Sequence, residues 1–423
     1  MVESIQFKDL DAPLRTDEDF LSYYSDKKNN VEDNYCKDNV FPSPFYELIP
    51  LVRGFALDPM HTVYAGCYGR RIQGFRSERG EGKLSSNQMH QIDKRILLFQ
   101  KCKPSDFDRK LRPLSASQKY KNHEHRNLLM YYQFPAFDGI MKEEDLTTIM
   151  KLQKAMILLG RSQITPVPKL DTEEARLDIK SYIQDLKDNK IPINYMTHAT
   201  LHVPDDVDFF GVGVERISAW IFESFQIFAR DGVRQGKKVC EQIRNRLMER
   251  FLYLLPTHAN GKIVSSEEMF ELEVAKFKNK NSKSRIVIDF KIGRGKKPQK
   301  TVTFPGFTIT NKFPNNVVLL QNGTVVVCFD ILKEANSDVL RIGVRKFTCL
   351  ESAFKIPYDS TRFSTFLGSK LSETVDLWNV NSIKGKMFAV PHALDNYSKL
   401  PKIFTSLSTK WFLTPIRHTL LVP

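Results

Sequence analysis

The 423-residue chain has few cysteines and places none of them in a metal-binding or disulfide pattern. Its six cysteines lie far apart, and no Cys-x-x-Cys pair occurs. Zinc ribbons and small disulfide-rich domains need closely spaced cysteines. The sequence therefore predicts reduced thiols that mostly pack in the interior, and no structural metal.

Long apolar segments are also lacking. No stretch approaches the roughly 18 apolar residues of a membrane-spanning helix, and Met1–Leu10 is mixed and acidic, unlike a secretion signal. We expect a soluble protein of the nucleus or cytoplasm that is not secreted and does not enter a membrane.

Three common catalytic or nucleotide-binding signatures are absent from the sequence. It contains no Gly-rich phosphate loop, no nucleophile elbow and no Cys/His dyad in a supporting context. No internal repeat occurs either. Hydrolase and nucleotide-switch functions consequently have no motif to support them.

What the chain does have is positive charge. Its formal net charge is +14 and its pI is about 9.3, while hydrophobic residues make up 41% of the sequence, enough for proper cores. Such a charge attracts acidic partners, of which DNA and RNA are the commonest. Self-association into a homo-oligomer stays open.

The patterning predicts an α+β protein in three parts. Residues 1–54 are polar and read as an extended segment with a few apolar anchors such as Phe7 and Leu10. Residues 55–260 show helical spacing, broken into pieces by prolines that include Pro135. Residues 261–423 form a basic linker and a small antiparallel β domain, with Asn322-Gly323 as a hairpin turn between two β-branched runs.

The tract from Lys276 to Lys300 carries ten Lys or Arg and one acid. It is either a solvated linker or a phosphate-binding strip. On the second interpretation the candidate contacts to the DNA backbone are Lys291, Arg294, Lys296 and Lys297.

The segment Asp58-Pro-Met-His61 has a local explanation: Asp caps a helix, Pro takes its first position, and an amphipathic helix runs to about Phe75. A functional interpretation requires more. His61 and Asp58 would have to face one space together with a carboxylate that is remote in sequence.

His198 and His202 stand four residues apart, so on a helix they share a face and could clasp a metal. The glutamate that follows the first histidine in zincins is absent. Because Asp205 and Asp206 follow directly, we favour a capped helix end with the histidines bonded to these acids.

Glu223 lies at the edge of the apolar face of a helix predicted over 217–231, beside Trp220. A carboxylate there is partly shielded. It is either catalytic or a boundary residue that pairs with Arg216 or Arg230.

Several blocks, taken in order, resemble the transposases of CACTA-like DNA elements. The blocks are Leu10–Phe20, Phe55–Gly66 with Arg70 and Arg71, Leu111–Ser115, His198–Val207, Ser218–Glu223, Phe354–Pro357 and Trp378–Pro391. Together they span most of the chain, and their order is more specific than any one of them.

The resemblance implies an RNase H-like core in which two aspartates and a glutamate hold Mg²⁺ or Mn²⁺, with a helical insertion before the glutamate. Glu223 matches the third acid, and Asp58 with His61 matches the insertion's Asp-x-x-His signature. The family's first two aspartates precede the block similar to Leu10–Phe20. The resemblance thus implies only the insertion, the last helix and the C-terminal β domain here, with most of the RNase H-like sheet missing.

Three hypotheses follow. The chain is a truncated transposase that cannot cut or join DNA alone, a domesticated DNA-binding or protein-binding factor derived from a transposon, or a complete enzyme of another kind. All three hypotheses depend on the same candidate residues. The structure tests them by showing which of these residues lie close together.

Overall fold

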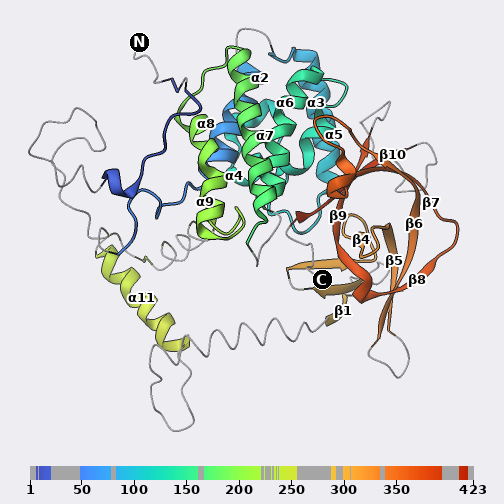
Figure 1. The fold of residues 1–423 in the computed structure, drawn as a ribbon. Helices are drawn as coiled ribbons and strands as arrows, with labels where there is room; N and C mark the ends of the chain where they lie inside the picture. The colour runs from blue at the N-terminus through green and yellow to red at the C-terminus, as the bar shows by residue number, and fades with distance from the viewer. Residues whose placement is uncertain are drawn as a thin grey trace, which may run out of the picture.

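The computed structural model describes residues 6–7, 9–20, 48–77, 82–160, 166–220, 223, 230, 233–234, 236, 238–254, 287–291, 299–304, 306–333, 339–392 and 409–417. Within them, long helices occupy the chain up to Leu254 and strands begin at Val287, which confirms the predicted α+β class (Figure 1).

In the helical region, several helices follow one another without a break and differ only in their pitch. The π-helix η1 runs directly into α2, and α4, η4 and α5 form one continuous helix. The bounds are η1 Met60–Tyr68, α2 Gly69–Ser77, α3 Ser86–Phe99, η2 Gln100–Cys102, η3 Leu114–Lys119, α4 Asn122–Asn127, η4 Leu128–Tyr132, α5 Gln133–Phe137, α6 Glu143–Leu159, α7 Lys169–Asp188, α8 Tyr195–Ala199, η5 Thr200–His202, α9 Val203–Phe210 and α11 Val239–Leu254.

The prediction that Pro135 breaks a helix is wrong. The helix continues through Pro135 as α5, directly after the π-helical turn η4. A π turn shifts the hydrogen-bond register, so a proline that follows it need not remove a regular i to i−4 bond. The guanidinium of Arg95 then donates to the carbonyl groups of Pro135, Ala136 and Asp138 and closes the helix end.

The strands form two antiparallel sheets. Their bounds are β1 Val287–Lys291, β2 Gln299–Phe304, β3 Phe307–Thr310, β4 Val317–Leu320, β5 Val325–Lys333, β6 Leu340–Ser352, β7 Phe366–Leu371, β8 Asp376–Asn379, β9 Ile383–His392 and β10 Lys410–Pro415, with the 3₁₀ turns η6 Ser360–Phe363 and η7 Val380–Ser382 between them. The predicted hairpin at Asn322-Gly323 joins β4 to β5, and Gly323 has a φ of +83° that suits glycine.

The larger sheet closes on itself. Its order is β5-β4-β9-β10-β7-β6-β8, and β5 also pairs with β6, so six strands form a closed ring with β8 beside β6. In β4, Val317 and Leu319 face a core with Trp411, whereas Val318 and Leu320 face a second core against β2 and β3. Because both faces of β4 are buried, this strand is continuously apolar.

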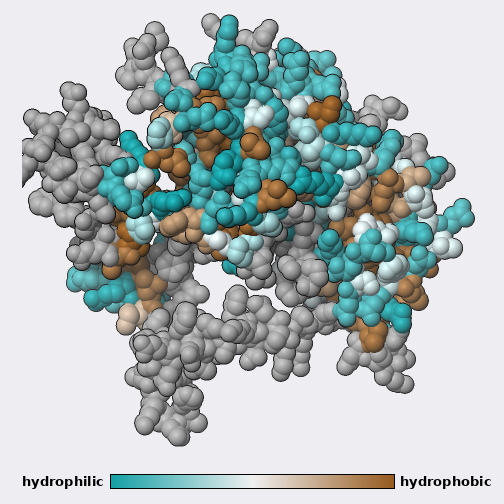
Figure 2. All heavy atoms as spheres, in the orientation of Figure 1, coloured by the Kyte–Doolittle hydropathy of each residue, from teal (hydrophilic) through white to brown (hydrophobic). Residues whose placement is uncertain are grey.

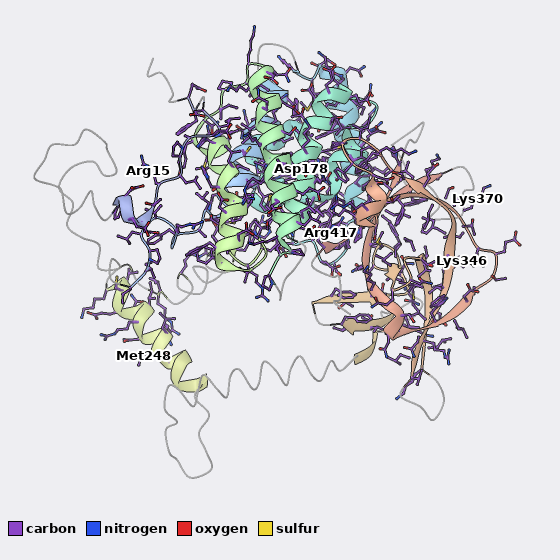
Figure 3. All side chains as sticks on the ribbon, in the orientation of Figure 1. Arg15, Asp178, Met248, Lys346, Lys370 and Arg417 are labelled. Atoms are coloured by element: carbon purple, nitrogen blue, oxygen red, sulfur yellow. The ribbon has the colours of Figure 1, made fainter. Side chains whose placement is uncertain are left out.

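The helices and the ring share one hydrophobic core. Phe388 of β9 lies against Phe107 and Tyr132 of the helical region, with ring centroids 5.4 Å and 4.8 Å apart. Beside it, the buried ammonium of Lys386 contacts the carboxylate of Asp106 at 2.5 Å. Figure 3 shows Arg417 where the end of the ring meets the helices.

The surface of the helical region is mainly polar. Hydrophilic residues cover most of its visible face (Figure 2). None of the described helices is both long and apolar enough to cross a membrane.

Candidate functional site

Asp58 caps two helical turns at once, the start of η1 and the turn in which the Glu223 amide donates to the Ala219 carbonyl oxygen at 2.9 Å. Its carboxylate accepts the backbone amides of Met60 (3.1 Å) and His61 (3.3 Å), which confirms the predicted cap of η1. The same carboxylate accepts the amide of Ala219 (2.8 Å) and the hydroxyl of Ser218 (3.3 Å). Free amides at a helix start favour a negative charge, so one carboxylate holds both helix starts together.

This shared cap brings His61 and Glu223 together from distant parts of the sequence. Each lies in the first turn after the cap. The His61 Nδ1 atom is 2.5 Å from Asp58 Oδ2, and its Nε2 atom is 3.5 Å from Glu223 Oε1. The imidazole therefore lies between two carboxylates. The arrangement that a functional role for Asp58 and His61 requires is present.

The site is open to solvent. The side chains of His61 and Glu223 are 54% and 47% exposed, while that of Asp58 is 22% exposed. The residues do not fit the two metal ions that the transposase resemblance implies. Mg²⁺ prefers several oxygen ligands in octahedral geometry, whereas the Asp58 oxygens are occupied by hydrogen bonds and an imidazole separates them from Glu223. Among the described residues no group of three His, Cys, Asp or Glu is arranged to hold a metal.

A second histidine lies beside this site, and sequence reasoning missed it. The His123 ring stacks on Trp220, with centroids 4.0 Å apart, and its Nδ1 atom is 3.4 Å from Asp108 Oδ2. Burial lowers the pKa of His123, although the charges of Asp108 and Glu223 act to raise it. In the sequence, the only pointer to this position was the short run His123-Glu124-His125. In the structure, Glu124 and His125 of that run are buried.

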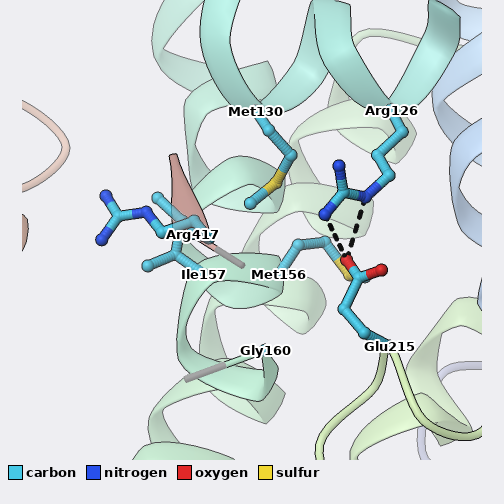
Figure 4. Close-up of a pocket in the computed structure, with 7 residues that line it drawn as sticks. All are labelled: Arg126, Met130, Met156, Ile157, Gly160, Glu215 and Arg417. Atoms are coloured by element: carbon cyan, nitrogen blue, oxygen red, sulfur yellow. Dashed lines mark hydrogen bonds and ion pairs between the residues drawn. The ribbon is translucent and has the colours of Figure 1, made fainter. Parts of the chain in front are cut away.

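The hollow next to Trp220 is also lined by a partly buried ion pair. Arg126 donates to Glu215 at 3.0 Å through both Nε and Nη2. The bonded pair lines a further cavity of about 60 Å³ together with Met130 and Met156 (Figure 4). The Tyr64 hydroxyl donates to Glu215 (3.2 Å), so the pair also anchors η1. This cavity is too small for anything but water-sized molecules.

Of the paired histidines further along the chain, only His202 lies beside one of the two acids, so the favoured interpretation describes one of the pair. His202 Nδ1 lies 3.6 Å from Asp205 Oδ2, and His198 stacks on Phe7 with centroids 4.8 Å apart. The neighbouring Asp206 accepts the amide of Leu57 at 2.7 Å. This block of the sequence therefore holds the segment that leads into Asp58.

The predicted phosphate-binding strip is mostly beyond the structural description. Lys291 ends strand β1, whereas Arg294, Lys296 and Lys297 lie outside the described residues. The cysteines agree with their predicted packing role in part: Cys67, Cys102 and Cys328 are buried free thiols, and Cys240 and Cys349 are exposed ones.

Comparison with known proteins gives one match. Residues 257–404 match a family model described as a domain of unknown function, DUF8592. The match begins after helix α11 and covers the strands from β1 to β9 with the segment before them. No curated protein and no solved structure matches the chain.

Proposed function

We propose that this chain is a transposase-derived, DNA-associated protein that does not cut or join DNA by itself. The observation that carries the proposal is the meeting of Asp58, His61 and Glu223 at one solvent-open site. These residues were singled out by their match to two separate CACTA-like blocks. Two unrelated surface positions would have no reason to share a helix cap.

The chemistry of the site supports binding or proton handling rather than metal-assisted strand cleavage. Two-metal catalysis requires several carboxylates that share both ions and fix the attacking water. Here the Asp58 carboxylate holds two helix starts, and Glu223 faces an imidazole. We therefore assign no step to Mg²⁺ or Mn²⁺ in this chain.

A plasmid-nicking assay tests the enzymatic part. The purified chain, incubated with supercoiled DNA and Mg²⁺ or Mn²⁺, should nick no more than its Glu223→Gln variant. Divalent-dependent nicking that disappears in Glu223→Gln would contradict the proposal and favour a complete enzyme.

Duplex binding tests the DNA-associated part. The net charge of +14 predicts weak, sequence-tolerant binding with a steep salt dependence. Replacing Lys291, Arg294, Lys296 and Lys297 by Gln should lower the log–log salt slope by about 3.6 units if all four contact phosphates, at about 0.9 per contact. An unchanged slope would make the strip a linker. No binding at low salt would contradict the proposed function itself.

A further inference from the structure

A second basic surface lies on the helical region, in the loops between α3 and α4. Its exposed cations are Lys101, Arg109, Lys110, Lys119 and Lys121, and we call them the basic band. The band falls outside the tract Lys276–Lys300. It therefore offers a separate surface for an acidic partner.

The loops that carry the band are folded by their own hydrogen bonds. Gln100 Nε2 donates to the carbonyl of Leu111 (2.7 Å), and Tyr120 donates its hydroxyl to the carbonyl of Arg112 (2.6 Å). Arg112 also donates to the buried Glu124 from Nε at 2.8 Å. The first bond holds Lys101 close to Lys110, and the second holds Lys119 and Lys121 close to Arg112. The five cations therefore stand on loops whose backbone is fixed by hydrogen bonds.

The band's cations differ from the neighbouring bases in having no partner. Arg95, Arg112 and Arg126 are engaged with carbonyl groups or carboxylates. None of the five band side chains makes an ion pair or side-chain hydrogen bond with a described residue. The nearby acids Asp106 and Glu124 are already neutralised by Lys386 and Arg112. Asp108 is the exposed acid beside the band, and it pairs with His123. The five cations therefore outnumber the acids around them.

The band also runs toward the candidate site. Arg109 follows Asp108, which pairs with His123, and His123 stacks on Trp220 near Glu223. The charges of Arg109 and Glu223 both act on His123, which places the two within electrostatic range of one ring. The Arg109 end of the band therefore lies near His123 and, through it, near the candidate site.

We propose that the basic band binds the phosphate backbone of duplex DNA and leads it past the Asp58–His61–Glu223 site. A row of separate cations on ordered loops suits an extended polyanion, because each phosphate is met by a different side chain. A small anion would instead need converging donors. The inference rests on the proposed DNA association and names the surface that would carry it.

The test compares two variants of equal charge. In the band variant Lys101, Arg109, Lys110, Lys119 and Lys121 are all changed to Gln. The matched control changes five exposed lysines elsewhere to Gln: Lys83, Lys142, Lys169, Lys190 and Lys355. Binding to a fluorescent duplex is measured by anisotropy across a salt series, and circular dichroism confirms that both variants fold.

The band variant should bind at least roughly a hundredfold more weakly at about 100 mM salt, and its log–log salt slope should fall by about 4.5 units if all five side chains contact phosphates, at about 0.9 per contact. The control should change far less. In the parent chain, hydrogen exchange of residues 101–121 should slow when duplex is added, which tests the surface without any substitution.

The outcomes separate the two proposals. If the parent binds DNA but the band variant behaves as the control does and residues 101–121 gain no protection, the band is not the DNA surface and the proposed function stands. If the parent binds no duplex at low salt, both proposals fail.

Discussion

Asp58 shows how one residue can be read as structural from the sequence and yet organise a site. The local pattern predicted an N-cap, and the cap is there. The local pattern could not predict the second set of hydrogen bonds, to Ser218 and Ala219. Nothing in residues 58–61 specifies a partner so distant in the chain. His61 and Glu223 meet because this one carboxylate caps both helices.

Replacing Asp58 by Ala should destabilise the protein by about 2 kcal/mol, since a helix cap contributes roughly 1 kcal/mol and here two helix starts lose theirs. Asp58→Asn, which keeps an acceptor oxygen, should cost less. Glu223→Gln, at an exposed position, should change stability by no more than about 0.5 kcal/mol. Thermal unfolding of the three variants measures these differences. Equal effects for Asp58→Ala and Glu223→Gln would contradict the double cap.

Individual elements were predictable where the periodicity is strong. Helix α7 buries Ile179, Tyr182 and Ile183 at the spacing that predicted it, and the Asn322-Gly323 turn joins β4 to β5. Pitch changes within a helix were not predictable. The π-helix η1 buries seven of its nine residues, so its sequence has no one-sided apolar pattern that could separate a π-helix from an α-helix, and its wider turns are visible only in the structure.

A substitution at Gly66 tests how tightly the π-helix η1 is packed. A Cβ atom at Gly66 would lie 2.5 Å from the His61 carbonyl oxygen and 3.1 Å from Met196 Cβ of α8. Gly66→Ala should therefore push η1 away from α8, at a cost of about 2 kcal/mol, and disturb the alignment of His61 with Glu223. Gly236→Ala is the control, because nothing lies within 4 Å of the added methyl group. Thermal unfolding of both variants is the measurement, and equal stabilities would show that η1 yields without strain.

The closure of the β ring and its docking on the helices were beyond sequence reasoning. Short β-branched runs predicted antiparallel strands, but closure depends on β5 pairing with β6 in addition to β4. Docking depends on aromatic residues from both regions, such as Phe107 and Phe388, whose partners lie far apart in the chain. The basic linker predicted between the two regions gave no hint that they share a core.

One contact between the regions should depend on pH. Glu174 of α7 binds Arg362 of η6 and Lys154 of α6, and the hydrogen bond from Arg362 is the main reason that the Glu174 pKa falls to about 2. A lowered carboxylate pKa stabilises the fold above the unfolded value of about 4.5, and the gain is lost as pH falls toward about 2.

Glu174→Gln should therefore lower stability at pH 6 by about 1 kcal/mol, a figure reduced for solvent screening, and the deficit should shrink as the pH is lowered to about 3. The neighbouring exposed Glu173→Gln should show no such deficit. Melting temperatures across this pH range measure both. A deficit for Glu174→Gln that is constant with pH would mean that the ion pairs contribute little.

The strongest link between the two regions is Lys386, which is fully buried and contacts Asp106, Asn315 Oδ1 (2.7 Å) and the carbonyl of Thr308 (2.8 Å). Burial lowers its pKa, while the carboxylate of Asp106 favours its charged form. Lys386→Met alone would leave the Asp106 carboxylate buried without its cation, which typically costs about 3–5 kcal/mol.

If the pair mainly aligns the two regions, the double variant Lys386→Met with Asp106→Leu should recover most of that loss, because no charge is left buried. Thermal unfolding is followed in the far ultraviolet for the helices and by tryptophan fluorescence for the ring, in a Trp220→Phe background that leaves only Trp378 of β8 and the buried Trp411. The two signals together measure stability and coupling. Lys386→Met should separate the two transitions, and the double variant should bring them back together. Coincident transitions in Lys386→Met would instead assign the coupling to the aromatic contacts of Phe388 with Phe107 and Tyr132, which that substitution leaves intact.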